Sequence, residues 1–315
     1  MSVGCPALAA FLFRSTKAGP MSLDLFLQHF LNALTLGSLY GLIAIGYTMV
    51  YGILRLINFA HGDILMLGAY FVFYGTTTFF LPWPVAVLVA IVGASLMGVL
   101  VDRVAYKPLR NAPRISALIT AIGVSLLLQN VFMLLFTATP KPFPAIFTGG
   151  NVTLGGGFTV SFITLLTILV AVVLMVLLQL FIKRTKIGKG MRAVSEDAGA
   201  AQLMGISVNT TISVTFAIGS ALAAVAAVLY SSAYPMIDPY MGSFLGIKAF
   251  VAAVLGGIGS IPGAMVGGLA MGVVESLTKA YISSQMADAV VFLILIVVLL
   301  VKPTGIMGKN IGEKV

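Results

Sequence analysis

Charged residues are scarce in this chain, because Asp, Glu, Lys and Arg together make up only 9% of its 315 residues. An ordinary soluble domain carries about 25% charged residues, which cover its water-facing surface. Apolar residues make up 60% of the chain. This composition excludes a soluble globular enzyme and a disordered chain, and it indicates that most of the chain lies in lipid.

Metal-binding and redox-active residues are also scarce. The chain has one cysteine, Cys5, and two histidines, His29 and His61. A single cysteine excludes an internal disulfide, a four-cysteine zinc site and an iron–sulfur cluster. Two histidines are too few for most transition-metal sites, so we expect no metal ligands in this chain.

Nucleotide-binding and catalytic motifs are absent as well. The only Gly-Lys pairs, Gly188-Lys189 and Gly308-Lys309, lack the earlier glycine and the following Ser or Thr of a phosphate-binding loop. Pro262 stands where a dinucleotide fingerprint starting at Gly257 needs its third glycine. There is no His-Glu-x-x-His motif, and both histidines lie in the first 61 residues, away from any nucleophile elbow. We therefore expect no catalytic residue and no cofactor.

Nine apolar stretches are candidate membrane spans, since a spanning helix needs about 20 mostly apolar residues. They cover residues 31–54, 62–80, 84–101, 115–136, 161–182, 210–230, 244–256, 263–282 and 287–301. The seventh is short, and only a glycine-rich turn at 256–263 separates it from the eighth. These two are either full spans or a broken helix pair that re-enters the membrane. The sequence thus predicts an all-α integral membrane protein, a polytopic bundle of about eight or nine transmembrane helices in a single domain, 21–315.

Glycine recurs at four-residue spacing in the eighth span, as Gly263-x-x-x-Gly267 and Gly268-x-x-x-Gly272. Lipid supplies no hydrophobic force between helices, so close backbone approach supplies the packing. We expect this span to pack closely against another helix, and a role of its glycines in conduction is the alternative.

The net charge of +9 is unevenly placed along the chain. With nine spans, 13 of the 18 basic residues fall on one side of the membrane: Arg55 and the clusters at 103–114, 183–192 and 302–314. Basic loops mark the cytoplasmic side. The charge therefore indicates a membrane face and a cytoplasmic C-terminus, and it gives no reason to expect nucleic acid as a partner.

Residues 1–20 differ from the rest of the chain. Their apolar patch at 6–13 is too short to span a bilayer, and Arg14 and Lys17 follow it, whereas a signal peptide carries its charge before the apolar run. Met21 is a second plausible start of translation. We treat 1–20 as an N-terminal extension that translation from Met21 would omit.

The loop after the fifth span, at about 183–208, is the most informative polar stretch. Ser195 is a good helix cap, and Glu196 and Asp197 favour the positive end of a first turn. Ala200 and Ala201 follow, and Gly205 can end the helix. We expect a short cytoplasmic helix that starts at Ser195 and has a small-residue face another protein can approach closely.

This loop resembles a known family. Its Ala200-Ala201-x-x-x-Gly205 is similar to the coupling loop of ABC importer permeases, although Gly199 replaces the usual Glu and the closing Leu-Pro is missing. Two further stretches, at 41–63 and 253–264, look like the permeases of branched-chain amino acid ABC importers. The match covers nearly everything after Met21, and the chain most resembles the shorter, H-type permease of that system.

The resemblance implies a heterodimeric pore in the bacterial inner membrane, formed with a second homologous permease. It implies two cytoplasmic ATPases that grip the coupling loop, and a periplasmic binding protein that delivers Leu, Ile or Val. Relatives in this family also carry urea, short amides or other amino acids, so these cargoes stay open as alternatives. The family further implies two inverted halves, of which the sequence shows a faint trace: a polar or glycine break beside an apolar span at 58–63 and again at 256–263.

These two breaks are candidates for the translocation pathway or a gate. Asn58, His61 and Asp63 either cap the next helix at the cytoplasmic face or form the end of a discontinuous helix that handles a charged substrate group. The second break carries Gly256, Gly257 and Gly259, which form either a tight turn or a flexible gate.

Ionisable residues within the spans are few. Glu275 lies deep in the eighth span, with Lys279 at the i,i+4 spacing that permits a pair. This pair has either a structural role or a pathway role. We expect the other such residues to snorkel from span ends: Asp63, Asp102, Lys248 and Asp288. A self-sufficient channel or ion-coupled carrier, using Glu275 and Asp63, is the alternative function, for which this set is thin.

Overall fold

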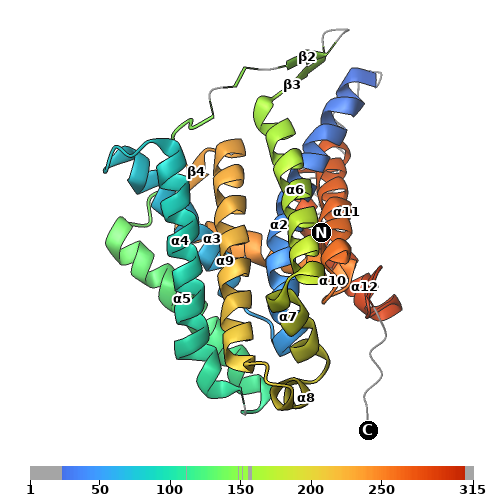
Figure 1. Cartoon of the computed structure of the whole chain (residues 1–315). Helices are drawn as coiled ribbons and strands as arrows, with labels where there is room; N and C mark the ends of the chain where they lie inside the picture. The colour runs from blue at the N-terminus through green and yellow to red at the C-terminus, as the bar shows by residue number, and fades with distance from the viewer. Residues whose placement is uncertain (1–22, 111, 148, 151, 155–157, 309–315) are drawn as a thin grey trace, which may run out of the picture.

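The computed structural model describes residues 23–110, 112–147, 149–150, 152–154 and 158–308 as a helical bundle (Figure 1). The N-terminal extension 1–20 and the basic residues Lys309 and Lys314 lie outside the described residues. The long helices are α2 (Leu23–Leu54), α3 (His61–Thr77), α4 (Trp83–Val101), α5 (Arg114–Phe136), α6 (Phe162–Arg184), α9 (Val208–Ala233), α10 (Met241–Gly256), α11 (Ile261–Tyr281) and α12 (Ala287–Val301). Short helices are η1 (Asp102–Tyr106), η2 (Lys107–Leu109), α7 (Lys186–Glu196) and α8 (Ala198–Leu203).

The long helices coincide with the nine predicted spans, and the all-α membrane bundle is confirmed. Among the described residues, six helices are long and apolar enough to cross a membrane: α2, α4, α5, α6, α9 and α11. The other three are shorter, with 17 residues in α3, 16 in α10 and 15 in α12. Eight or nine as the number of crossings therefore stays a prediction.

Two short antiparallel strand pairs were not expected from the sequence. β1 (Lys141–Pro142) pairs with β4 (Met236–Ile237), and β2 (Val152–Leu154) pairs with β3 (Phe158–Val160). Both pairs involve the long loop between α5 and α6, and Figure 1 shows them at one end of the bundle. The first pair ties this loop to the connection between α9 and α10.

Helix α2 forms the centre of the bundle. Its membrane-spanning part is almost wholly buried, and it packs against α11, α9, α10 and α6. The peripheral helices α4, α5 and α6 instead leave most of their residues partly or fully exposed. Outward-facing leucines such as Leu88, Leu134 and Leu169 belong to the surface that meets lipid.

Glycines allow α2 and α11 to touch through their backbones. A methyl group added at Gly268 would overlap the backbone of Gly41, and one added at Gly272 would overlap that of Gly37. The predicted Gly268-x-x-x-Gly272 packing motif is therefore confirmed. Its partner is a second motif with the same spacing, Gly37-x-x-x-Gly41, which was not expected from the sequence.

The basic segments at 102–110 and 183–192 lie together at one end of the bundle, the lower end in Figure 1, with α7 and α8. There the Arg110 guanidinium, just after η2, donates a hydrogen bond to the side chain of Asn209 in the first turn of α9. This contact joins the loop between α4 and α5 to the first turn of α9. The predicted grouping of these two basic clusters on one face agrees with this arrangement.

Candidate functional site

The loop predicted to couple transport to a partner contains two helices, α7 and α8. The predicted start of the short helix at Ser195 is wrong. Ser195 lies inside α7, where its hydroxyl donates to the carbonyl of Arg192 at 2.7 Å. The cap of the second helix is Asp197, whose Oδ1 accepts a hydrogen bond from the backbone N–H of Ala200 at 2.9 Å. Asp197 is the more favourable cap because its carboxylate accepts a hydrogen bond from a free N–H of the first turn and its negative charge lies at the positive end of the helix.

The end of this helix is as predicted. Gly205 has φ of 83°, the left-handed conformation in which glycine commonly ends a helix. Its N–H donates to the carbonyl of Gln202 at 3.0 Å, and the N–H of Ile206 reaches the carbonyl of Ala201. Ser207 then caps α9, accepting a hydrogen bond from the N–H of Thr210. A connection of only four residues, 204–207, therefore separates α8 from α9.

Helix α7 connects α8 to the membrane bundle. Thr185 caps it, accepting from the N–H of Gly188 at 3.0 Å. Its buried face carries Met191 and Val194, and α7 packs against α6, α9 and α2. A methyl group at Gly188 would overlap the backbone of α6, so α7 sits directly on that helix. The contacts of α7 thus link α8 to three helices of the bundle.

Helix α8 presents apolar side chains to the solvent at the end of the bundle. Leu203 is 90% exposed and Met204 is 83% exposed, although both lie among polar loops. Ala201 is buried against the bundle, whereas Glu196 and Ala200 are exposed. Exposed apolar residues rimmed by polar ones are typical of a protein–protein contact.

The first predicted break lies inside the bundle. A methyl group at Gly46 would overlap the imidazole of His61, so the first residue of α3 lies beside Gly46. Gly46 is eight residues before the end of α2, about 12 Å at 1.5 Å per residue. Residues 55–60 therefore turn back into the bundle before α3 begins, as in a discontinuous helix.

Side chains of the break do not cap α3, so that interpretation is wrong. The cap residue is Ala60, which has no side-chain group to offer. Asn58 instead accepts a hydrogen bond from the hydroxyl of Tyr106 at 2.9 Å. His61 lies edge-on against the ring of Tyr47, with ring centroids 4.8 Å apart. These residues thus point to different neighbouring elements and do not share one pocket.

Asp63 points to α5. Its Oδ1 accepts a hydrogen bond from Gln129 Nε2 at 3.0 Å, and the same Nε2 lies 3.0 Å from Ser125 Oγ. Sequence reasoning missed Gln129 and Ser125, although two polar residues at i,i+4 spacing in an apolar span are a usable signal. Three buried atoms at this break have no hydrogen-bond partner among the described residues: Asn58 Nδ2, His61 Nε2 and Asp63 Oδ2.

The second break is a tight turn, stabilised by the C-terminal segment. Gly257 and Gly259 have φ of 105° and 97°, and Ser260 caps α11 by accepting from the N–H of Gly263. The N–H groups of Ile306 and Met307 donate to the last carbonyls of α10, each at 2.9 Å. The tight-turn interpretation agrees with this geometry, and a gating role stays a prediction.

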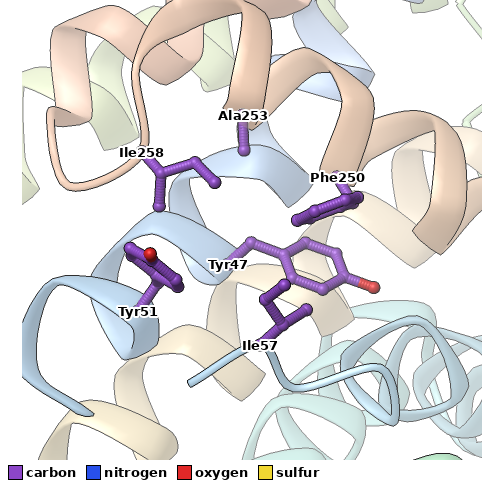
Figure 2. A pocket seen from close by; sticks show the side chains of 6 residues that line it. All are labelled: Tyr47, Tyr51, Ile57, Phe250, Ala253 and Ile258. Carbon is purple, nitrogen blue, oxygen red and sulfur yellow. The ribbon is translucent and has the colours of Figure 1, made fainter. Parts of the chain in front are cut away.

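The two breaks face each other across a small pocket (Figure 2). Tyr47 and Tyr51 come from α2, and Phe250 and Ala253 come from α10. Ile57 lies just before the first break, and Ile258 lies in the second. The lining is Tyr47, Tyr51, Ile57, Phe250, Ala253 and Ile258. The rings of Tyr47 and Phe250 are 6.2 Å apart. The pocket holds about one water molecule and is too small for an amino acid.

Glu275 is the centre of a buried ion cluster. Its Oε1 lies 2.6 Å from Lys279 Nζ and 2.9 Å from Lys248 Nζ, and its Oε2 accepts from the hydroxyl of Tyr40 at 2.8 Å. Lys248 also pairs with Asp288 at 2.6 Å. The predicted Glu275–Lys279 pair is confirmed. Because the cluster joins α2, α10, α11 and α12 and pairs both carboxylates, its contacts favour the structural interpretation.

The expectation that charged residues snorkel from the span ends is wrong for three of them. Asp63 and Asp102 are fully buried, and Lys248 is only 4% exposed. Asp102 accepts from Arg110 and from Ser213, each at 2.6 Å. These side chains are held by partners inside the bundle, and the long-range partners are not visible in the local sequence.

The comparison with known proteins decides the family. A family model described as "Branched-chain amino acid transport system / permease component" matches residues 29–299. The chain belongs to this family. It is 47% identical over 304 residues to LivH of Escherichia coli strain K12 and 46% identical over 302 residues to BraD of Pseudomonas aeruginosa. Both relatives are described as high-affinity branched-chain amino acid transport system permease proteins.

Each match covers 92% of this chain and 98% of the relative. LivH of Salmonella typhimurium gives the same coverage at 46% identity. The resemblance drawn from the coupling loop and the two breaks is therefore confirmed for the family. With its apolar helices, the chain is a multi-pass protein of the bacterial inner membrane.

Proposed function

We propose that this chain is the non-catalytic permease subunit of an ATP-driven importer that carries leucine, isoleucine and valine across the inner membrane. The family match over residues 29–299, with 98% of each relative covered, supports this function. The proposed partners are a second homologous permease, two cytoplasmic ATPase subunits and a periplasmic binding protein. Urea, amides or other amino acids are the alternative cargoes, and uptake with each candidate cargo distinguishes them.

Helix α8 is the proposed contact for an ATPase subunit. Its exposed Leu203 and Met204 offer an apolar contact, and exposed Glu196 lies beside it. The basic segments at 102–110 and 183–192 lie at the same end of the bundle, which supports a cytoplasmic position for α8 and for the C-terminus. Closure of the ATPases would push on α8, and α7 and α9 would carry the movement into the membrane helices.

The ion pairs of Glu275 argue against its use as the coupling carboxylate of the ion-coupled alternative. Both carboxylates of the cluster are paired with lysines, and Tyr40 supplies a further hydrogen bond. A carboxylate that must bind and release a driving ion usually lies in a water-filled cavity or a proton relay. Energy supplied by another subunit fits this arrangement better.

ATP-dependent uptake of radiolabelled leucine into proteoliposomes tests the proposal. The complete complex is expected to accumulate leucine, and liposomes that lack this chain are not. Leu203→Asp is expected to abolish uptake and copurification of the ATPases, because a carboxylate replaces the exposed apolar contact. Ile187→Asp is the matched control, since Ile187 is also exposed, at 49%, but lies on α7. Normal uptake by Leu203→Asp would refute the coupling role of α8.

A further inference from the structure

Asp63 differs from the other buried acids in having no cationic partner. The described part of the chain contains three acids that are at most 1% exposed: Asp63, Asp102 and Glu275. Asp102 pairs with Arg110, and Glu275 pairs with Lys248 and Lys279. Asp63 forms no ion pair with any described residue, and its Oδ2 has no hydrogen-bond donor there. An ionisable residue left unpaired within the membrane is a strong indication of a functional site.

The neighbours of Asp63 can accept additional hydrogen bonds. Gln129 Nε2 is directed at both Asp63 Oδ1 and Ser125 Oγ. The Ser125 oxygen can accept a second hydrogen bond, and Asp63 Oδ2 can accept a full one. Both side chains are at most 9% exposed, so a positively charged group with several N–H donors would satisfy these acceptors inside the bundle.

An apolar surface continues from this acceptor site along α3 and α5. Tyr70 is seven residues after Asp63, on the same face of α3, and Phe136 is seven residues after Gln129 on α5. The ring of Tyr70 lies 5.3 Å from those of Phe132 and Phe136. The Asp63 carboxylate could bind the ammonium group of an amino acid, and the neighbouring rings of Tyr70 and Phe136 could contact its branched aliphatic side chain.

We propose that Asp63, with Ser125 and Gln129, binds the α-ammonium group of the transported amino acid at the interface between α3 and α5. This inference rests on the proposed function and names the group that the carboxylate recognises. Asp63 is fully buried here, so the ammonium reaches it only when α5 separates from α3. Helix α5 suits this movement, because its other face is exposed, with Ile119 at 62% and Leu134 at 81%.

Asp63→Asn in the complete transporter tests the proposal, because it removes the charge but keeps an oxygen that Gln129 can bond. With the binding protein saturated by leucine, the rate of ATP-dependent uptake is expected to fall at least tenfold, since charge-assisted hydrogen bonds are about twice as strong as neutral ones. Asp238→Asn is the control outside the helices; among the described residues, the Asp238 side-chain oxygen accepts a hydrogen bond from the N–H of Tyr240. An unchanged uptake rate in Asp63→Asn would overturn the ammonium site.

A ligand series on the wild-type complex keeps the proposal testable if Asp63→Asn does not accumulate in the membrane. Leucine and isopentylamine, which both carry an ammonium, are expected to raise the melting temperature of the detergent-solubilised complex. The deaminated analogue 4-methylpentanoate is not. Stabilisation by 4-methylpentanoate alone, or by sodium chloride but not choline chloride, would contradict the proposal. If the wild-type complex shows no ATP-dependent leucine uptake, the proposed function itself fails, whereas failure of the ligand series alone rejects only the ammonium site.

Discussion

The contact between α2 and α11 allows a sharp prediction, because one methyl group there is expected to lower stability. A Cβ added at Gly37 would lie 2.7 Å from Leu269 Cα and 2.9 Å from the carbonyl oxygen of Gly268. Both are backbone atoms, so no side chain can move aside. The helices must separate by about 0.7 Å to bring the shorter distance to the 3.4 Å of ordinary contact.

The sign of the stability change in Gly37→Ala follows from two opposing contributions. Overpacking a close contact costs about 1–3 kcal/mol. Alanine favours a helix interior over glycine by about 1 kcal/mol. We therefore expect Gly37→Ala to lose up to about 2 kcal/mol of stability, with further loss as the reciprocal contact between Gly41 and Gly268 loosens.

Gly123→Ala is the matched control, because Gly123 lies inside α5 with nothing within 4 Å of the added methyl group. Only the helix-propensity term remains there, so this variant is expected to gain up to about 1 kcal/mol. The assay compares the heating temperature at which each detergent-solubilised variant loses its monodisperse chromatographic peak. Gly37→Ala is expected to melt several degrees below wild type and Gly123→Ala at or above it. Equal melting temperatures for the two variants would refute the backbone-contact argument.

Two further variants probe the buried charges and the second break. Glu275→Leu leaves Lys248 buried beside half-exposed Asp288 alone, so it is expected to cost about 3 kcal/mol in the same melting assay, and adding Lys248→Met should restore part of the loss. An unchanged melting temperature in Glu275→Leu would show that the cluster does not hold the helices together. Gly257→Val places a β-branched residue at φ of 105° against the backbone of Gly308, so the segment after α12 should become sensitive to limited proteolysis. Wild-type protease resistance would count against the docking of that segment on α10.

Much of the bundle could be predicted because each membrane helix corresponds to a run of about 20 mostly apolar residues in the sequence. Helix α7 has no such run. It is short and amphipathic, and its two glycines, Gly188 and Gly190, disfavour a helix locally. Packing against α6 requires the small residue at Gly188, since any side chain would overlap that helix. Tertiary contact therefore decides this element, and the local sequence does not reveal it.

The candidate sites show the same division. The cap-and-glycine pattern predicted a helix ending at Gly205, because capping is local, but two neighbouring acceptors, Ser195 and Asp197, made its start ambiguous. The partners of buried charges could not be predicted, because they can lie far away in the sequence: Tyr40 lies 235 residues from Glu275. Single-sequence reasoning can indicate that such a charge needs a partner, and only the fold supplies which one.

Helix α2 is the element through which movement at α8 can reach both breaks. It contacts α7 near the cytoplasmic end of the bundle, as proposed, and it supplies Tyr47 and Tyr51 to the pocket between the breaks. A methyl group at Gly52 would lie 3.7 Å from the Cα of Gly259, so α2 touches the second break directly. His61 packs against Gly46 and Tyr47, which couples the start of α3 to the same helix. Since interiors this closely packed transmit strain, we expect a shift of α2 to move the start of α3, and with it Asp63, relative to α5.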